Sequence, residues 1–510
     1  MTGWQRLLND NGGLDTEGLK KCACDGFDTY QVYPNSIHRL QDALIFIARH
    51  DGQKALIIIG DNPSTSSFVG SEISTIPGGA KVCPLDVANS RALFAAFPFT
   101  RPQTQKGRTL SIGLGDRLGL AAPGHLSAIR GYDVFPVLAQ QSIRELNLTG
   151  RTYEEVLAAA AWGVFQEGYT KGYGADGDHL KTRQEISYAL RCGYTRITLD
   201  CSDHIKNSVL SFSPEEIEKQ YQALSADVRS HYEAKYLNKA IPLDDSTIVQ
   251  FSSGGFYKRV LLYHEAIQFM VDIYRELIEP MSDKPDFEIS IDETLTETSP
   301  EDHFFVAAEL LDANVVFDSM APRFCGRFEK GIDYIGSAVE FDKTLQVHLK
   351  IARKLGYRIS VHSGSDKFSI FPYIGKYAEG IYHLKTAGTH WLEALRVVSR
   401  YEPSFFRRIF SYALEHLDEA RSYYSISADI TKIPDVNKVA DSQLPTFLEE
   451  EPSRQVLHIT YGLLLTAKNS DGSYTFKDEL YKFLYEHESQ YDATVDEHLK
   501  RHMNSLGIVK

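Results

Sequence analysis

The residues best suited to chemistry stand in short polar segments that follow apolar runs. The segment GADGDHLKT (174–182) places Asp178 beside His179, and a later segment, VHSGSDKF, carries His362. Imidazole and carboxylate groups are the ligands that a catalytic divalent metal takes while it keeps a position open for substrate. A carboxylate near such an ion is also suited to proton transfer. The two segments therefore predict a metal-assisted enzyme site.

Similar polar residues recur along the chain after other apolar runs. One such cluster is weak support, because solvated loops are polar in any case. Five clusters that each follow a predicted strand favour a shared site. The further candidates are Gln141, Asp200, Asp203, His204, Asp292, Glu293, Glu297, Ser365, Lys367 and Lys385.

The elements that must position these residues are strands that alternate with helices from about residue 108. Such alternation is typical of parallel βα units. Eight strands predict an α/β fold of the TIM (β/α)₈ barrel class, in which the reaction site lies at the carboxyl ends of the strands. The predicted strands are 109–116, 134–141, 170–179, 195–202, 287–293, 314–320, 358–365 and 381–388.

The remaining sequence predicts additions to the barrel. Residues 1–107 form an N-terminal accessory region, 108–395 the catalytic barrel, and 396–510 a C-terminal helical extension. A helical insertion at about 213–280 is a candidate lid above the barrel mouth, since closure commits an intermediate and excludes water. The charged run FLEEEPSR (447–454) is expected to be a solvated loop.

Composition limits the classes of partner. The 510 residues carry a formal net charge of −14 and a pI near 5.7, which argues against bulk attraction to nucleic acid or anionic membrane. Met1 precedes a polar segment without an apolar signal region, and no apolar run approaches the length that spans a bilayer. We therefore expect a cytoplasmic protein with a small-molecule substrate. Its oligomeric state is left open, and a homo-oligomer is compatible with the sequence.

Two glycine-containing segments bear on anionic ligands. GLGDRLG (113–119) has the spacing G-x-G-x-x-x-G, which departs from the dinucleotide fingerprint and disfavours NAD. HSGSDKFS (362–369) has the small residues and the lysine of an anion cradle, and a simple glycine-serine turn is an equal alternative.

Several longer segments, taken together, resemble the tagaturonate epimerase family, which interconverts tagaturonate and fructuronate in hexuronate breakdown. The resemblance covers roughly 30–500 and rests on GLGDRLGLAAPGH, DVFPVLAQQSIREL, GYGADGDHLKT, APRFCGRFEKGIDYIG and VHSGSDKFSIFP. The order DGDHL, LDCSD, acidic fifth strand and HSGS also resembles the class II metal-dependent ketose-bisphosphate aldolases. AQQSIRELNLTGRTYEE and LKTAGTHWLEALR are similar to the non-catalytic Z subunits that accompany some of these aldolases.

The aldolase resemblance implies roles for individual residues. The Asp-His pair implies that Asp178 transfers a proton and that His179 is a metal ligand, and the histidine of the glycine-serine loop implies a second ligand at His362. The acidic end of the fifth strand implies a second acid/base, for which we choose Glu293 over Asp292.

The sequence departs from the aldolase pattern at the sixth strand. The segment NVVFDSMAPRF lacks the metal-binding histidine of the aldolases, so the third ligand is open. We predict His204, and the alternatives are Glu293, His303 and Asp318. Histidine-carboxylate sites accept zinc, manganese, cobalt or nickel, so the ion is a divalent metal of unspecified identity.

The implied reaction inverts the carbon β to a ketone, where no enolate supports simple proton abstraction. Retro-aldol cleavage and re-addition would achieve the inversion, and direct carboxylate acid-base chemistry is the alternative. Arg323, Lys367 and Lys385 are candidates for holding the uronate carboxylate, with Gln141 and Ser365 as further substrate contacts. A ketose-phosphate aldolase and a non-catalytic aldolase-associated subunit are the competing functions, and activity on fructose or tagatose is left open.

Overall fold

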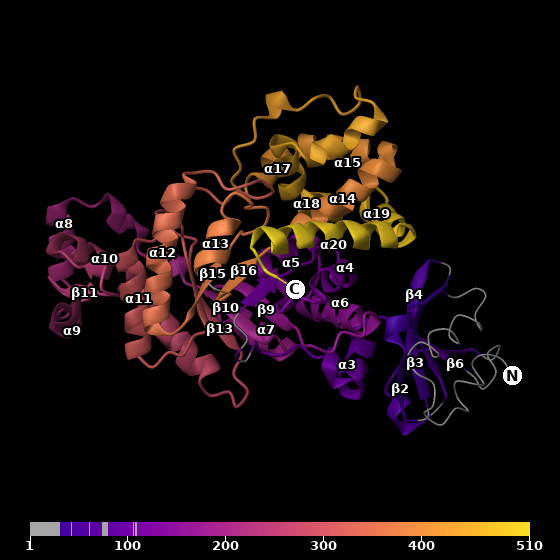
Figure 1. The fold of residues 1–510 in the computed structure, drawn as a ribbon, viewed down its shortest axis with the longest axis horizontal. Helices are drawn as coiled ribbons and strands as arrows, with labels where there is room; N and C mark the ends of the chain where they lie inside the picture. The colour runs from indigo at the N-terminus through magenta and orange to yellow at the C-terminus, as the bar shows by residue number, and fades with distance from the viewer. Residues whose placement is uncertain are drawn as a thin grey trace.

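Eight parallel strands close into a barrel at the centre of the molecule (Figure 1). The computed structural model describes residues 31–509, apart from 42, 51, 61, 74–79, 106, 108–109, 379 and 387. The predicted fold class is confirmed, since each predicted strand contributes to the barrel. The strands are β7 (Leu110–Gly113), β8 (Phe135–Ser142), β9 (Gly174–Leu180), β10 (Arg196–Asp200), β13 (Asp286–Ile291), β14 (Ser319–Pro322), β15 (Arg358–Val361) and β16 (Tyr382–Lys385).

The sixth barrel strand begins later than the sequence predicts. Helix α11 (Pro300–Asp312) ends just before Asn314, whose left-handed backbone (φ 61°) turns the chain. The apolar residues 315–317 then lead to β14, and Val316 is 68% exposed. Most of the apolar run from which the strand was predicted therefore precedes β14 and leads into it.

Helices cover the outside of the barrel, and their starts are encoded locally. Helices α5, α6, α7 and α11 each begin with a capping box, in which a Ser or Thr and an acidic residue satisfy each other's free backbone N–H groups. Helix α12 ends at Gly356, whose φ of 85° suits glycine. The outer helices not yet given are α4 (Ala122–Ile129), α5 (Ile143–Thr149), α6 (Tyr153–Gln166), α7 (Arg183–Cys192), α12 (Ala338–Leu355), α13 (Phe371–Ala378) and α14 (Thr389–Tyr401).

An antiparallel sheet precedes the barrel and lies at one end of the molecule (Figure 1). Its inner face packs on α6 through Ala161, Trp162 and Phe165, with help from α3 (Val87–Ala96). The sheet therefore braces the outside of the barrel. Its strands are β1 (Gln31–Val32), β2 (His38–Leu40), β3 (Ala43–His50), β4 (Gln53–Ile59), β5 (Ser71–Ile73) and β6 (Ala80–Pro84), and short 3₁₀ turns lie at Pro34–Ser36, Pro63–Thr65 and Pro98–Thr100.

A long excursion follows β10 and lies at the opposite end of the molecule (Figure 1). It packs against α11 and against its own long helix, α10, and includes a small hairpin. Its elements are the 3₁₀ turns Ser202–His204 and Asn207–Ser211, helices α8 (Pro214–Gln222), α9 (Ala226–Tyr236) and α10 (Ser253–Ile273), strands β11 (Ala240–Pro242) and β12 (Ile248–Gln250), and the π-helical turn Tyr274–Ile278.

The C-terminal extension forms a helical layer with its own apolar core. Helix α20 runs between this layer and the barrel and contacts α4 and α14 (Figure 1). The expected solvated loop at 447–454 is a wrong prediction, because Phe447, Leu448 and Arg454 are buried in this layer. The elements are α15 (Pro403–Glu415), α16 (Leu417–Ala420), the 3₁₀ turns Ile430–Lys432 and Asp441–Leu448, α17 (Glu451–Ile459), α18 (Tyr461–Thr466), α19 (Lys477–Glu486) and α20 (Glu488–Ser505).

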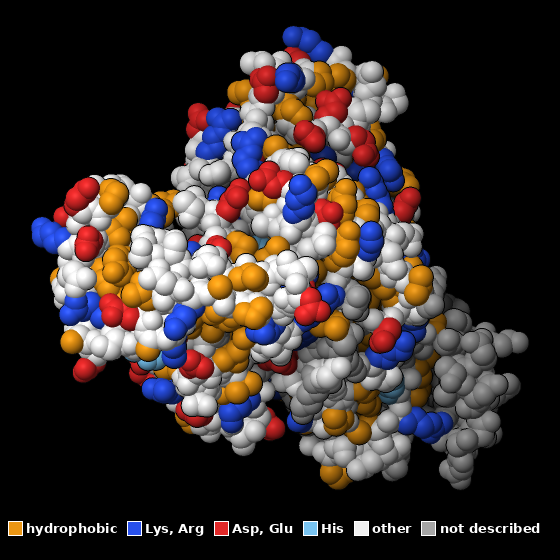
Figure 2. All heavy atoms as spheres, turned by 60° about the vertical axis from the view of Figure 1, so that its left-hand side comes forward, with side chains coloured by type: hydrophobic (Ala, Val, Ile, Leu, Met, Phe, Trp, Pro, Cys, Tyr) orange, Lys and Arg blue, Asp and Glu red, His pale blue; other side chains and the backbone are white. Residues whose placement is uncertain are grey.

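The surface mixes charges of both signs. On the face in Figure 2, Lys and Arg side chains are interspersed with Asp and Glu, and no single basic patch gathers there. Among the described helices, none combines the length and the apolar character needed to cross a bilayer.

Candidate active site

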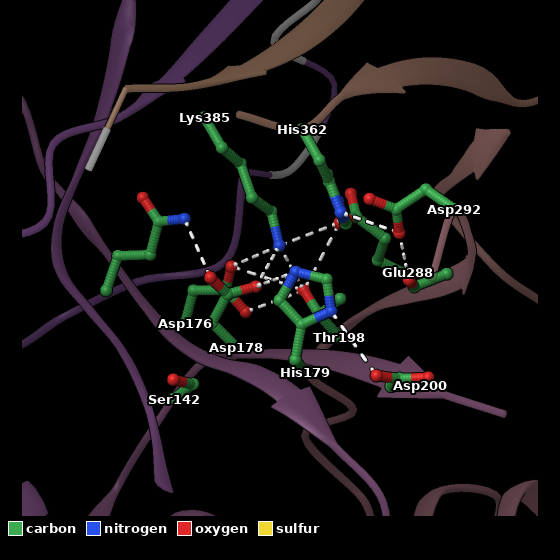
Figure 3. A network of polar contacts seen from close by, with 12 residues as sticks. Ser142, Asp176, Asp178, His179, Thr198, Asp200, Glu288, Asp292, His362 and Lys385 are labelled. Carbon is green, nitrogen blue, oxygen red and sulfur yellow. Dashed lines mark hydrogen bonds and ion pairs between the residues drawn. The ribbon is translucent and has the colours of Figure 1, made fainter. Parts of the chain in front are cut away.

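Three potential metal ligands converge at the carboxyl ends of three barrel strands. His179 comes from β9, Asp292 follows β13 and His362 follows β15, and one ligand atom from each lies within 4.8 Å of the others. The two imidazole rings meet edge to face, with centroids 4.8 Å apart (Figure 3). Tertiary structure thus brings together the two predicted histidines, and it adds Asp292 to them.

The backbone at this cluster is unusual. His179 has a φ of 49° and Ser363, next to His362, has a φ of 48°. Non-glycine residues rarely adopt this left-handed conformation, and where they do, the strain is often part of a functional site. Here the turn at each strand end directs an imidazole toward the other.

Carboxylates lie beside both rings. His362 Nε2 lies 2.7 Å from Glu288 Oε1, and its Nδ1 lies 3.1 Å from Asp292 Oδ1. His179 Nδ1 lies 3.6 Å from Asp200 Oδ2. Burial lowers the pKa of His179, but attraction to Asp178 and Asp200 outweighs it and raises the pKa to about 10. Carboxylates that orient ligating histidines in this way are typical of metal sites.

The residues present fit a divalent cation. Two imidazoles and one carboxylate are a common donor set for such ions. Asp200 Oδ2 lies 3.6 Å from the buried His179 Nδ1, just beyond hydrogen-bond distance, which leaves Nε2 of the ring as the atom to face an ion. Burial raises the pKa of Asp292, but attraction to His362 and His179 holds it well below the usual range, so the carboxylate stays ionised.

Lys385 occupies a nest of carboxylates inside the barrel (Figure 3). Its Nζ lies 2.5 Å from Asp178 Oδ1, 3.0 Å from Asp176 Oδ2 and 2.9 Å from Glu288 Oε1, and it donates to Thr198 Oγ1 at 2.7 Å. A buried ammonium with these partners is already neutralised. The prediction that Lys385 holds the substrate carboxylate is therefore wrong, because these internal partners already surround its ammonium group.

Asp178 is held ionised by the same nest. Burial raises its pKa, but attraction to Lys385, His179 and His362 outweighs burial and leaves the pKa well below the usual range. Its Oδ2 accepts a hydrogen bond of 3.2 Å from Gln140 Nε2. The carboxylate is thus ionised and fixed beside the candidate metal ligands.

Gln140, which sequence reasoning passed over, lies in this network, and Gln141 does not. Gln141 Oε1 accepts from Arg117 at 3.1 Å, and its Nε2 donates to the Asp116 carbonyl at 2.8 Å. Gln140 is in register with Asp176, so its side chain shares the inner face of the barrel. Strand alternation was the signal that could have selected Gln140.

A cavity of about 380 Å³ opens beside the cluster and includes Asp292 and His362 in its lining. No residue of the 213–280 insertion lines it, so the insertion does not have the position of the predicted lid. The C-terminal extension supplies Tyr423, Tyr424 and Ser425 instead. The other lining residues are Arg144, Glu293, Pro322, Arg323, Phe324, Gly326, Arg327, Phe328, Glu329, Lys330 and Ser363.

Lys367 anchors a loop and does not face this cavity. Its buried Nζ donates to the carbonyls of Glu329 (2.9 Å), Ile332 (2.6 Å) and Ser365 (3.0 Å). Three acceptors use all three donors of an ammonium group. The prediction that Lys367 binds the substrate carboxylate is therefore wrong, and Ser365 contributes its carbonyl to this anchor.

The proposed anion cradle at 362–369 is likewise occupied by the chain itself. The backbone N–H of Asp366 donates to His502 Nε2 at 3.0 Å, and that of Ser369 donates to the Asp333 carboxylate at 3.1 Å. Of the two alternatives predicted for 362–369, the anion cradle and the simple glycine-serine turn, the structure supports the turn.

Replacing Lys367 with methionine should lower the free energy of unfolding by about 1–3 kcal/mol, since it leaves buried carbonyls without donors. Urea unfolding measures the change. Lys376→Met, in the exposed part of α13, is the matched control and should change stability by less than about 0.5 kcal/mol. Equal effects of the two variants would contradict the anchoring role.

The other predicted ligands lie elsewhere. The His204 ring stacks on Phe269 of α10, with centroids 3.8 Å apart, and is not part of the cluster. His303 is buried and bonded to His348 and Tyr357. The Asp318 carboxylate accepts from the Phe287 N–H at 2.8 Å, near the amino end of β13 and so away from the site.

Glu293 and Arg323 both reach the cavity. Glu293 is exposed there, next to Asp292. The Arg323 guanidinium donates to the Thr294 carbonyl, and its backbone N–H is bonded to Thr298 Oγ1 at 3.0 Å. Asp292 and Glu293 follow the last residue of β13, so the turn there places Asp292 beside His362 while both residues line the cavity.

An eight-stranded parallel barrel with imidazoles, carboxylates and cations gathered at one rim defines a (β/α)₈-barrel enzyme class. The sequence model of the tagaturonate epimerase family matches residues 33–506, and the chain belongs to this family. The predicted resemblance is thereby confirmed.

Individual relatives agree with this assignment. The tagaturonate/fructuronate epimerase of Thermotoga maritima is 39% identical over 481 residues, which is 94% of this chain and 97% of that protein. The glycerol-bound crystal structure of the fructuronate-tagaturonate epimerase of Cohnella laeviribosi is 47% identical, covers 94% of this chain and 97% of its own, and superposes with a TM-score of 0.92. The native structure of the same enzyme gives the same values.

Proposed function

We propose that this protein is a cytoplasmic, metal-dependent epimerase that interconverts D-tagaturonate and D-fructuronate. The observation that carries the proposal is the convergence of His179, Asp292 and His362 beside an ionised Asp178, at the active rim of a barrel that belongs to the tagaturonate epimerase family. The cavity next to this cluster has cationic side chains suited to a sugar acid.

The reaction must invert carbon 4, which is β to the ketone at carbon 2. The C3–C4 bond is an aldol bond, so its cleavage and re-formation on the other face of the aldehyde inverts carbon 4 without any change in composition. A zinc, manganese, cobalt or nickel ion held by His179, Asp292 and His362 would polarise the ketone oxygen and stabilise the negative charge left by cleavage.

The protein's own carboxylates handle the protons in this proposal. Asp178, kept ionised by Lys385, accepts the proton of the 4-hydroxyl group as cleavage begins. Glu293, exposed in the cavity, enters the step protonated and gives its proton to the alkoxide formed by re-addition on the opposite face. Proton exchange with water then restores the ionised Asp178 and the protonated Glu293. In the reverse direction the two exchange roles. The aromatic side chains Phe328 and Tyr424 in the cavity lining limit escape of the fragment and access of water.

Incubation of metal-loaded protein with tagaturonate, followed by NMR, tests the proposal. We expect fructuronate to appear, and we expect Asp178→Asn to lower kcat by about 10²–10³-fold while the protein stays folded. Asp203→Asn makes the same chemical change at an exposed carboxylate paired with Lys181 and should retain nearly full activity.

The other outcomes are equally informative. Three-carbon fragments in place of fructuronate would identify an aldolase. An inactive wild type with bound metal would show that tagaturonate is not the substrate. Full activity of Asp178→Asn would remove Asp178 from the mechanism.

A further inference from the structure

Four cationic side chains line the cavity, and two of them are already engaged. The Arg323 guanidinium donates to the Thr294 carbonyl. Arg327 Nη1 lies 3.4 Å from Glu329 Oε1 and is exposed. The remaining two are Arg144, which is exposed, and Lys330, which is half-buried.

Lys330 has no counterion within the described part of the chain. Its Nζ donates to Ser363 Oγ at 3.0 Å, and no described carboxylate lies within ion-pair distance. Burial, together with repulsion from Arg144 and Arg117, lowers the pKa of Lys330 despite some attraction to Glu145. An ammonium group kept in such a place is costly unless an anion joins it.

Arg144 likewise lacks a carboxylate partner among the residues that the structure describes. Its guanidinium carbon lies 4.8 Å from the ring centre of Tyr424, which supports the planar group from one side. The adjacent Glu145 does not neutralise it, because that carboxylate is bonded to Arg117 and to the backbone N–H of Ser142. The fork of N–H donors on Arg144 is therefore available to a ligand.

Both cations share the cavity with Asp292 and His362. Lys330 is joined to Ser363, the residue next to His362, so the unpaired charge lies close to the candidate metal ligands. A ligand that fills the cavity would place an anionic group on Arg144 and Lys330 and its oxygen-rich chain toward the cluster.

We propose that Arg144 and Lys330 form the subsite for the substrate carboxylate and so set the preference for hexuronates over neutral ketohexoses. The inference rests on the proposed function. In it, Arg144 and Lys330 take the carboxylate-binding role that the sequence suggested for Lys367 and Lys385, both of which make internal contacts in the structure. The subsite takes a carboxylate at the end of a sugar chain, because guanidinium and ammonium donors together match its two oxygens.

The loop that carries Lys330 is fixed before substrate arrives. Lys367 holds the carbonyls of Glu329 and Ile332, and Arg454 Nε donates to the Gly331 carbonyl at 2.7 Å. Gln455 Nε2 donates to Glu329 Oε2 at 2.7 Å. The C-terminal extension thus preorganises the subsite, which spares the ligand the cost of ordering it.

Steady-state kinetics with tagaturonate test the subsite in Arg144→Met and Lys330→Met. The matched control is Arg408→Met, at an exposed arginine that pairs with Glu479 and does not line the cavity. Each of the first two should lower kcat/KM by about 10²-fold, mainly through KM, since a charge-assisted contact to the substrate carboxylate is lost. The Ki of neutral tagatose as a competitor should stay within about 2-fold of wild type, and Arg408→Met should be near wild type in both measurements.

The outcomes separate the subsite from the proposed function. Wild type that epimerises tagaturonate, with unchanged KM in both variants, would overturn the subsite alone. An equal loss of tagatose binding would also overturn it, because the residues would then be general structural supports. If wild type fails to turn over tagaturonate, the proposed function fails, and calorimetric titration of the three variants with tagaturonate still decides whether Arg144 and Lys330 bind the carboxylate.

Discussion

Replacement of His362 with alanine should remove bound divalent metal and lower epimerase activity by about 10³-fold or more. His362 supplies one of two imidazoles in the cluster, and its loss leaves His179 and Asp292 to hold the ion. The stabilisation that a metal gives to developing charge amounts to several kcal/mol, and about 1.4 kcal/mol corresponds to a tenfold change in rate.

Metal content by mass spectrometry, measured with the activity, checks this prediction. His204→Ala is the matched control, because it removes the same group from a ring that stacks on Phe269 outside the cluster. It should keep its metal, whereas Asp292→Asn should bind metal more weakly. The reverse pattern, with metal lost from His204→Ala and kept in Asp292→Asn, would restore His204 as the third ligand.

Replacement of Lys385 with methionine should lower the free energy of unfolding by about 3–5 kcal/mol and abolish activity. The ammonium group compensates three buried carboxylates, those of Asp176, Asp178 and Glu288. Without it these carboxylates repel one another in a site that water reaches poorly, although Arg196 still lies 2.5 Å from Glu288. They must then take up protons or unfold the barrel interior.

Denaturant unfolding measures the loss of stability, and Lys482→Met is the control. Lys482 is 78% exposed and pairs with Glu486 at 4.0 Å on the helix surface, so its removal should cost less than about 1 kcal/mol. A similar small cost for Lys385→Met would mean that the carboxylate nest is solvated or protonated in the folded protein.

Much of the fold could be predicted because its signals are local. Buried parallel strands appear in the sequence as short apolar runs. The alternation of these runs with helices indicated the barrel. Capping boxes stand at the starts of α6 and α7, and Gly356 stands at the end of α12, so these helix ends are encoded in neighbouring residues. The late start of β14 was missed, because an apolar run has no signal that separates the strand from its approach.

The candidate site was predictable only in part. Asp178 and His179 stand together in sequence at a strand end, and His362 stands at another, so barrel geometry alone brings them to one rim. The choice of Asp292 as a ligand depended on how the chain turns after β13. No spacing in the sequence specifies that turn.

The sequence by itself determined the barrel, the rim on which chemistry collects and the Asp-His pair. Only the tertiary structure decided which charges are free. Lys367 and Lys385 are occupied by partners from distant segments, whereas Arg144 and Lys330 are left without counterions. The physical reason is that the state of a buried charge depends on its neighbours in space, and those neighbours come from strands and loops far apart in the chain.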